Sequence, residues 1–180
     1  MTNHRPYSLI PYDPDWANRF NFHAEIIQKV LGPIVLKIHH IGSTSIPGMA
    51  AKPNIDIEVV ASNLDEVRNL SAKMVEAGYT PRGDYSNIGE EYFTEDAKNG
   101  ERLTSIHVLP AGHTDIQMQL NFRDYLRTHA EDRELYADTK RRLYGKYRND
   151  YGSYDSGKKD VIEAIKKRAE SWSKSRQSPH

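Results

Sequence analysis

The spacing of apolar residues predicts a helix near the amino terminus. Gly32 and Pro33 end the apolar run, because glycine favours a helix end and proline cannot continue a helix. Asp13 followed by Pro14 is typical of a helix start, since the acid can cap free amides and proline fits the first helical position. The apolar positions of this amphipathic helix are Trp16, Phe20, Ile27, Val30 and Leu31.

Two runs rich in β-branched residues follow, Ile34–Ile41 and Asn54–Ala61, and they predict two strands on either side of a glycine turn. A second helix is expected after them, opened by Asn63 and closed by Gly78. The apolar positions of this second helix are Leu64, Val67, Leu70, Met74 and Val75.

Two later apolar runs, Glu91–Glu95 and Leu103–Leu109, are strand candidates and predict a hairpin, because the turn-forming residues 96–100 separate them. A strand–helix–strand start followed by further strands and helices is typical of a layered α/β or α+β fold.

The carboxyl-terminal part is predicted to be helical from Thr114, with interruptions at residues 129–131 and 151–157. We therefore expect one domain over residues 1–180. Its parts are an α/β core over residues 1–112, a helical flank over residues 113–172 and a flexible tail over residues 173–180.

The composition is typical of a folded domain, and the chain has no cysteine for thiol chemistry. Apolar residues make up 37% of the chain, and eleven tyrosines add large amphipathic surfaces. The absence of cysteine excludes disulfides, thiolate catalysis and cysteine-based metal sites. Residues 1–14 contain three prolines and do not resemble a secretory signal, and no membrane-length apolar run exists, so we expect a cytoplasmic protein without a membrane partner.

The charges of the chain balance as a whole but are unevenly distributed along it. The 25 basic residues balance the 25 acidic ones, so the chain carries no strong signal for nucleic acid. Residues 1–122 hold 10 bases and 15 acids, whereas residues 123–180 hold 15 bases and 10 acids. An acidic body joined to a basic flank suits a metal on one side and phosphates on the other, although solvated helix faces give the same pattern.

The turn between the first two predicted strands is the main candidate for phosphate binding. Gly42 allows a sharp turn, and the hydroxyl groups of residues 43–45 supply short donors for an anion. A Walker A loop is excluded, because Gly42 and Gly48 are six residues apart and Lys52 lies four residues further on. An ordinary hydroxyl-rich turn is the alternative. The candidate phosphate-binding residues here are Gly42, Ser43, Thr44 and Ser45.

Asp56 and Glu58 lie two apart on the second predicted strand, so their carboxylates point to the same face. Paired carboxylates fit Mg²⁺, which prefers oxygen ligands and is often shared with substrate phosphates. A solvent-facing strand with alternating acids is the alternative interpretation.

The run His40–Ile57 resembles the signature of the GrpB-like proteins, which belong to the DNA polymerase β-like nucleotidyltransferase superfamily. The resemblance covers nearly the whole chain. Its other parts are Tyr12–Trp16, Ile106–Val108, Phe122–Arg127 and the pair Tyr154 and Lys158.

This resemblance implies an α+β (α/β) nucleotidyltransferase-like mixed sheet with flanking helices. It implies that Ser43 contacts a nucleotide phosphate, and that Asp56 and Glu58 are the first two acids of a site for Mg²⁺ or Mn²⁺. Active members of the superfamily have a third carboxylate on a later strand. The strand that matches carries His107 and no acid, which leaves Glu91 and Glu95 on the neighbouring strand as candidates.

Four basic or titratable groups complete the candidate site. His107 is a candidate ligand or base, with a core histidine as the alternative. Lys52 can offset phosphate charge, and Arg123 with Lys158 can close over phosphates from the helical flank, although all three also suit a solvated surface. His40 is a better candidate than His39, and the tyrosines of the flank are expected to cover helix interfaces.

The sequence therefore predicts a magnesium-dependent nucleotidyltransferase that binds a nucleoside triphosphate and transfers a nucleotidyl group to an unknown acceptor. The alternative is a non-catalytic module that binds a nucleotide or another phosphorylated small molecule. Relatives of such domains occur joined to dephospho-CoA kinase, so this alternative includes a link to coenzyme A metabolism. No pattern indicates the oligomeric state.

Overall fold

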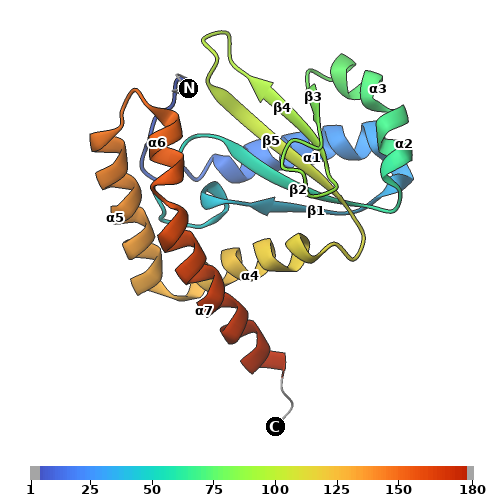
Figure 1. Cartoon of the computed structure of the whole chain (residues 1–180). Coiled ribbons are helices and arrows are strands. Elements are labelled where there is room, and N and C mark those ends of the chain that lie inside the picture. Colours follow the sequence, from blue (N-terminus) through green and yellow to red (C-terminus); the bar gives the residue numbers. More distant parts are fainter. Residues whose placement is uncertain (1–4, 178–180) are drawn as a thin grey trace.

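The computed structural model describes residues 5–177, so the first four residues and the last three of the expected tail lie outside the described part. A five-stranded mixed sheet forms the centre, with the strand order β1-β2-β5-β4-β3 (Figure 1). Only β2 and β5 are parallel, and the other neighbours are antiparallel. The strands are β1 (Val35–Ile41), β2 (Ile55–Ala61), β3 (Thr80–Gly83), β4 (Glu91–Asp96) and β5 (Arg102–Pro110).

Helices cover the sheet from two sides. The first group packs on the apolar face of the sheet and consists of α1 (Trp16–Leu31), α2 (Leu64–Asn69) and α3 (Ser71–Glu76). The second group forms the flank and consists of α4 (Thr114–Thr128), α5 (Ala130–Lys146), α6 (Tyr151–Ser156) and α7 (Lys159–Gln177) (Figure 1). The predicted mixed α+β fold with flanking helices is confirmed.

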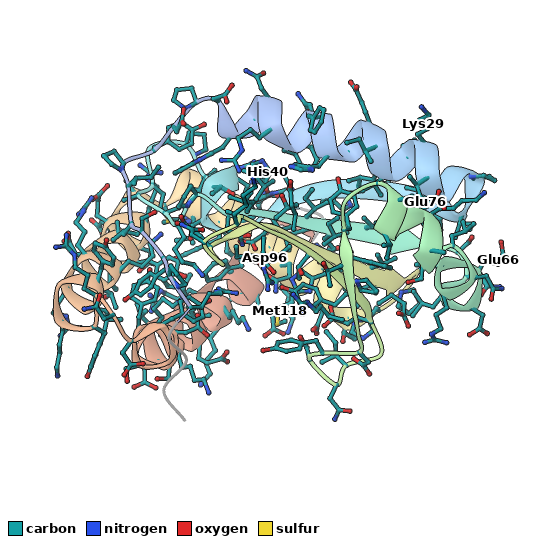
Figure 2. All side chains as sticks on the ribbon, turned by 90° about the horizontal axis from the view of Figure 1, so that it is seen from above. Lys29, His40, Glu66, Glu76, Asp96 and Met118 are labelled. Carbon is teal, nitrogen blue, oxygen red and sulfur yellow. The ribbon has the colours of Figure 1, made fainter. Side chains whose placement is uncertain are left out.

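The alternation of β2 explains the two faces of the sheet. Ile55, Ile57 and Val59 are fully buried and join the core with α1, because residues two apart on a strand share a face. Figure 2 shows α1 along one side of the sheet, with Lys29 pointing away from it. The intervening residues, Asp56 and Glu58, face the helical flank and place polar groups there.

A second apolar cluster holds the flank against the segment that follows β1. Ile46 and Met49 are fully buried in it, and they pack with side chains of α4, α5 and α7. The segment between β1 and β2 is therefore fixed by two cores, one on each side. Its 3₁₀ turn, η2 (Ser43–Ser45), lies where the sheet meets the flank.

The predicted strands and hairpin are confirmed within one or two residues, but several boundaries are wrong. Helix α1 begins at Trp16, and Asp13 accepts the amide of Asp15 at 2.9 Å without capping the helix. The helix predicted after β2 is divided at Leu70 into α2 and α3. Strand β3 was not predicted, because its four exposed residues include a proline and a glycine.

The carboxyl-terminal boundaries also differ. The interruption at His129 is confirmed, but residues 151–157 contain α6, which the Asp150 side chain caps by accepting the Ser153 amide at 3.1 Å. Helix α7 continues to Gln177, so residues 173–177 are helical and not tail. The small polar residues around α6 are typical of a break, yet burial of Tyr154, which is 1% exposed, stabilises the helix. Within the described residues, no helix has both the length and the apolar character that crossing a bilayer requires.

Candidate functional site

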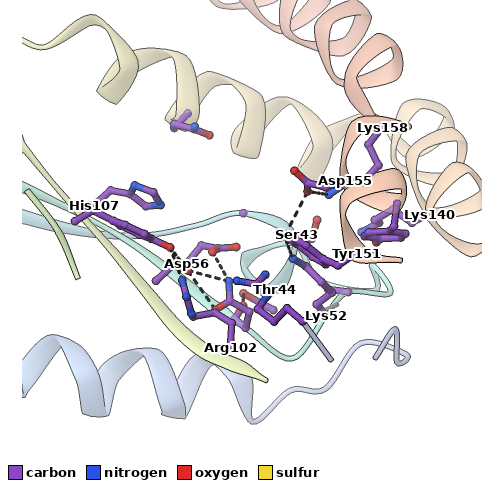
Figure 3. Close-up of a pocket in the computed structure, with 18 of the residues that line it drawn as sticks. Ser43, Thr44, Lys52, Asp56, Arg102, His107, Lys140, Tyr151, Asp155 and Lys158 are labelled. Atoms are coloured by element: carbon purple, nitrogen blue, oxygen red, sulfur yellow. Dashed lines mark hydrogen bonds and ion pairs between the residues drawn. The ribbon is translucent and has the colours of Figure 1, made fainter. Parts of the chain in front are cut away.

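A polar cavity of about 700 Å³ lies between the sheet and the helical flank. Its walls come from η2, from the polar face of β2 and β5, and from α5, α6 and the residues around them. In Figure 3, Asp56 lies in its middle, His107 lies at one end, and Lys140 and Lys158 lie at the other. The predicted residues that line it are Gly42, Ser43, Thr44, Lys52, Asp56, His107 and Lys158.

Gly42 allows the turn to approach Asp56. Its φ is +68°, in the region that favours glycine, and a Cβ atom built on it would lie 2.4 Å from Oδ2 of Asp56. Asp56 also accepts a hydrogen bond from Asn54. Burial raises the pKa of Asp56, while nearby Lys52 and His107 oppose the rise. The carboxylate is therefore held against the turn and faces the cavity.

The hydroxyl groups of η2 have separate partners. Ser45 is buried, donates to the carbonyl of Gly42 at 2.6 Å and does not line the cavity. Thr44 donates to the carbonyl of Asn54 at 3.2 Å. The amides of Ser45 and Ile46 bond within the turn, whereas the first amides of such a turn have no partner inside it. The Ser43 side chain is hydrogen-bonded with Tyr136 and, like Thr44, lines the cavity.

Glu58 shares a strand face with Asp56 but lines a different, adjoining cavity of about 190 Å³. It is 1% exposed, and its Oε1 has no hydrogen-bond partner among the described residues. Burial raises the pKa of Glu58 to about 7, although His107 opposes the shift. The two carboxylates predicted to form one metal site therefore line separate cavities.

His107 lines both cavities and is paired with a carboxylate that the sequence analysis missed. Its Nδ1 lies 2.7 Å from Oε2 of Glu90, which is fully buried and also accepts the amide of Ser86 at 3.2 Å. Burial raises the pKa of Glu90, but the interactions with His107 and the hydrogen bonds from Ser86 together outweigh this effect and lower the pKa. The His107 ring stacks on Tyr92 with centroids 4.6 Å apart. Glu90 precedes β4 in a loop, and no local pattern distinguishes it from Glu91.

The third carboxylate of the superfamily is not supplied by β4 or β5. Ser105 pairs with Asp56 in the sheet register, at the position where an acid would face it. Glu91 pairs with Arg68, and Glu95 accepts from Thr104, so neither candidate lines the cavity. In the part of the chain that the structure describes, no three His, Asp or Glu side chains are grouped to hold a metal ion. The three-carboxylate metal site therefore does not fit these residues.

Basic side chains give the cavity its charge. Lys52 donates to the Tyr151 hydroxyl at 2.7 Å, and burial together with the nearby Lys158 lowers its pKa to about 7. Burial and Lys158 also lower the pKa of Lys140 to about 7. Lys158 pairs with Asp155 at 2.8 Å. The other basic residues of the lining are Arg5, Arg82 and Arg102.

Arg123 lies outside the cavity lining, in contrast to its predicted role over the phosphates. Its Nη1 donates to the carbonyl of His40 at 3.2 Å, and Arg127 donates to the carbonyl of Ser45 at 2.7 Å. These arginines therefore attach α4 to the end of β1 and to η2. The ring of His40 faces α1, where it stacks on Phe20 with centroids 4.8 Å apart, so His40 is not part of the cavity.

Tyrosine rings also line the cavity, and the sequence analysis assigned those of the helical flank to helix interfaces. Tyr85 is 73% exposed, so its ring is accessible from the cavity mouth. The abundance of tyrosine was visible in the sequence, but only the tertiary structure places rings of α5, α6, β4 and the loop before β4 along one cavity. The tyrosines of the lining are Tyr85, Tyr92, Tyr136, Tyr151 and Tyr154.

Comparisons with known proteins agree with the fold. The protein family described as GrpB matches residues 6–168. The UPF0157 protein YqkA of Bacillus subtilis is 36% identical over 173 residues, which cover 96% of this chain and 50% of that protein. The chain thus spans about half the length of this relative. The crystal structure of the conserved protein GrpB from Enterococcus faecalis has a TM-score of 0.82 at 27% identity and covers 89% of this chain and 98% of that one.

More distant structures share the fold alone. The GLD-2/RNP-8 complex has a TM-score of 0.55 at 12% identity and covers 85% of this chain and 58% of that chain. The Cid1 poly(U) polymerase has a TM-score of 0.52 at 12% identity, with 77% of this chain and 43% of that one covered. Both agree with a polymerase β-like fold. A dephospho-CoA kinase of Mycobacterium tuberculosis is 28% identical over 159 residues, which cover 75% of this chain and 39% of that protein.

Proposed function

This chain belongs to the GrpB protein family and has a nucleotidyltransferase-like fold, and from this premise we propose that its polar cavity binds a nucleoside triphosphate or a related nucleotide. The observation that carries the proposal is the joint lining of one cavity by the Gly42–Thr44 turn, six basic side chains and five tyrosines.

The basic end of the cavity suits phosphates. Lys140 and Lys158 line the same cavity as Ser43, and ammonium groups together with the backbone amides of a turn attract anions. The Tyr85 ring suits a base, because it is exposed at the cavity and base–aromatic stacking tolerates different bases. A nucleotide satisfies both ends, whereas inorganic phosphate satisfies only one.

Calorimetric titration tests this proposal with a defined panel of ligands. The panel contains four ribonucleoside triphosphates, dephospho-coenzyme A, inorganic triphosphate and adenosine. We expect at least one nucleotide to bind more tightly than inorganic triphosphate and much more tightly than adenosine. Lys140→Met should weaken binding, while Lys29→Met, on the exposed face of α1, should leave it unchanged. If every nucleotide fails to bind the wild-type protein, the proposal is wrong.

Dephospho-coenzyme A is in the panel because a dephospho-CoA kinase resembles this chain over 159 residues. This compound combines an adenine nucleotide with a diphosphate and therefore matches the same two ends of the cavity. Preferential binding of dephospho-coenzyme A would support a regulatory binding module connected with coenzyme A metabolism. Preferential binding of a triphosphate would support a site built for nucleotidyl chemistry.

A second candidate function is nucleotidyl transfer, and the His107–Glu90 pair favours it. Nδ1 of the imidazole is hydrogen-bonded to Glu90, so Nε2 remains to take the proton from the hydroxyl group of the acceptor substrate. In this step the hydroxyl oxygen bonds to the α-phosphorus, the bond to the leaving pyrophosphate breaks, and the proton passes to His107. The adjoining cavity, which shares His107, offers room for a small acceptor.

Pyrophosphate release from labelled triphosphates, in the presence of fractionated metabolites, tests the transfer reaction. We expect His107→Gln to abolish release and to retain nucleotide binding, because the imidazole would move a proton and would not hold the phosphates. Absence of release in every fraction, with nucleotide binding intact, would leave the binding module as the function.

A further inference from the structure

Three lysines from separate segments meet at one wall of the cavity. Lys52 follows the η2 turn, Lys140 lies in α5, and Lys158 lies between α6 and α7. Lys140 is 2% exposed and Lys158 is 8% exposed, which is unusual for lysine. Ammonium groups gathered in this way repel one another, and a bound anion would relieve this repulsion.

Each ammonium group is held over a tyrosine ring. The Nζ atoms of Lys52, Lys140 and Lys158 lie between 4.4 and 4.8 Å from the ring centroids, and cation–π attraction fixes their positions before any ligand arrives. The three pairs are Lys52 with Tyr151, Lys140 with Tyr136 and Lys158 with Tyr154.

The ammonium groups also have unused donors. Lys52 donates to the Tyr151 hydroxyl, Lys140 to the carbonyl of Ala50, and Lys158 to Asp155. An ammonium group has three N–H donors, so each of these groups has donor capacity beyond its one recorded acceptor among the described residues. Phosphate oxygens are acceptors that can fill this capacity, because they are negatively charged and several lie close together.

The carboxylates that would hold a divalent metal are not gathered at this wall. Glu58 lines the adjoining cavity, and Ser105 stands where a third acid would face Asp56. Asp155 is already paired with Lys158. The cavity lining therefore has six basic side chains and only two carboxylates, Asp56 and Asp155.

We propose that Lys52, Lys140 and Lys158 form a polyphosphate subsite that binds the triphosphate part of a nucleotide without a divalent metal ion. This inference rests on the proposed nucleotide binding and adds how the phosphates are held. The lysines supply the positive charge that Mg²⁺ supplies in sites rich in carboxylates, since ammonium groups and metal ions can stabilise the same phosphate oxygens. Inorganic triphosphate and the tightest nucleotide of the panel are its probes.

Titration of both probes in excess EDTA and in excess Mg²⁺ tests the inference. We expect binding in EDTA to be at least as tight as in Mg²⁺, because Mg²⁺ neutralises the charges that the lysines recognise. Lys140→Met and Lys158→Met should each weaken binding in EDTA by about tenfold or more, the loss expected for a charged hydrogen bond. Lys174→Met, on the exposed end of α7, is the matched control.

The conservative variant Lys52→Arg separates charge from folding, because it keeps the cation at a half-buried position. It should retain binding in EDTA, whereas Lys52→Met should lose it at an unchanged melting temperature. Binding that requires Mg²⁺ would overturn the lysine subsite and leave nucleotide binding standing. Absence of binding in both buffers would instead contradict the proposed function.

Discussion

Gly42 and Asp56 are in such close contact that no side chain fits between them. A Cβ atom on Gly42 would lie 2.4 Å from Oδ2 and 3.0 Å from Cβ of Asp56. The turn and the carboxylate therefore reach their observed positions only because residue 42 is glycine. The contact joins the end of β1 to the beginning of β2 at the floor of the cavity.

Gly42→Ala should displace Asp56 and weaken nucleotide binding. The added methyl group meets the Asp56 side chain, whose movement is limited by its hydrogen bond from Asn54, and the positive φ of Gly42 is strained for alanine by about 1–3 kcal/mol. Calorimetric titration and thermal unfolding measure the two effects. Gly48→Ala is the matched control, because Gly48 has a φ of +81° but no atom within 4 Å of its added Cβ. Equal loss of binding in both variants would contradict the role of the contact.

Nucleotide binding should take up protons above neutral pH. The pKa values of Lys52 and Lys140 are lowered to about 7 by burial and by neighbouring cations, and a bound polyanion raises them again. The affinity is then full below pH 7 and falls as the pH rises through about 7 and beyond. The charged groups around the two lysines are Arg5, Asp56, Arg141, Asp155 and Lys158.

Titration in buffers of different ionisation enthalpy, at a pH above 7, measures this proton uptake. Lys140→Met should reduce the number of protons taken up, because one of the two groups is removed. A measured uptake of zero in the wild-type protein, or a release of protons, would contradict the prediction.

Glu58→Gln should stabilise the protein above pH 7. Burial raises the pKa of Glu58 from 4.5 to about 7, so the stability that this group contributes is present below 4.5 and is lost as the pH rises through 7. Glutamine does not ionise and avoids this loss. Urea unfolding on both sides of the window measures the difference, with Glu76→Gln on the exposed face of α3 as the control. A variant that loses stability at high pH as the wild-type protein does would refute this assignment.

Arg127→Met should lower stability more than it lowers nucleotide affinity. Arg127 donates twice to the carbonyl of Ser45, and the loss of a charged hydrogen bond is worth about 1.5–3 kcal/mol. Arg123→Met should behave alike, since Arg123 donates to the carbonyl of His40. Arg141→Met removes exposed ion pairs and is the control for stability alone, which it should change little. If Arg123→Met abolishes binding at unchanged stability, Arg123 contacts the ligand.

Local patterns were sufficient for the elements of the core. The branched residues of β1 and β2 and the spacing from Trp16 to Leu31 predicted strands and a helix that the structure contains. Local composition did not predict helices that depend on tertiary packing. One glycine lies within α6 and another directly follows it, yet the segment is helical because Tyr154 is buried. The exposed β3 carries no strand pattern and is held by its pairing with β4.

The candidate site was also predicted only in part from the sequence. The glycine turn, Asp56 and His107 were identified from the sequence, and all three line the cavity. The period of two along β2 placed Asp56 and Glu58 on one face, but the sheet register and the loop before β4 divided that face between two cavities.

The sequence by itself determined the helices and strands of the core, the glycine turn, and the placement of Asp56 and Glu58 on one face of a strand. These features depend on the type and spacing of residues that are close together in the chain. Only the tertiary structure decided which charges meet. Lys52 and Lys158 are 106 residues apart, and Lys140 and Glu90 have no local feature that separates them from solvated residues. Their roles depend on the packing of α5 and α6 beside η2 and of β4 beside β5, since burial and long-range pairing are properties of the folded chain.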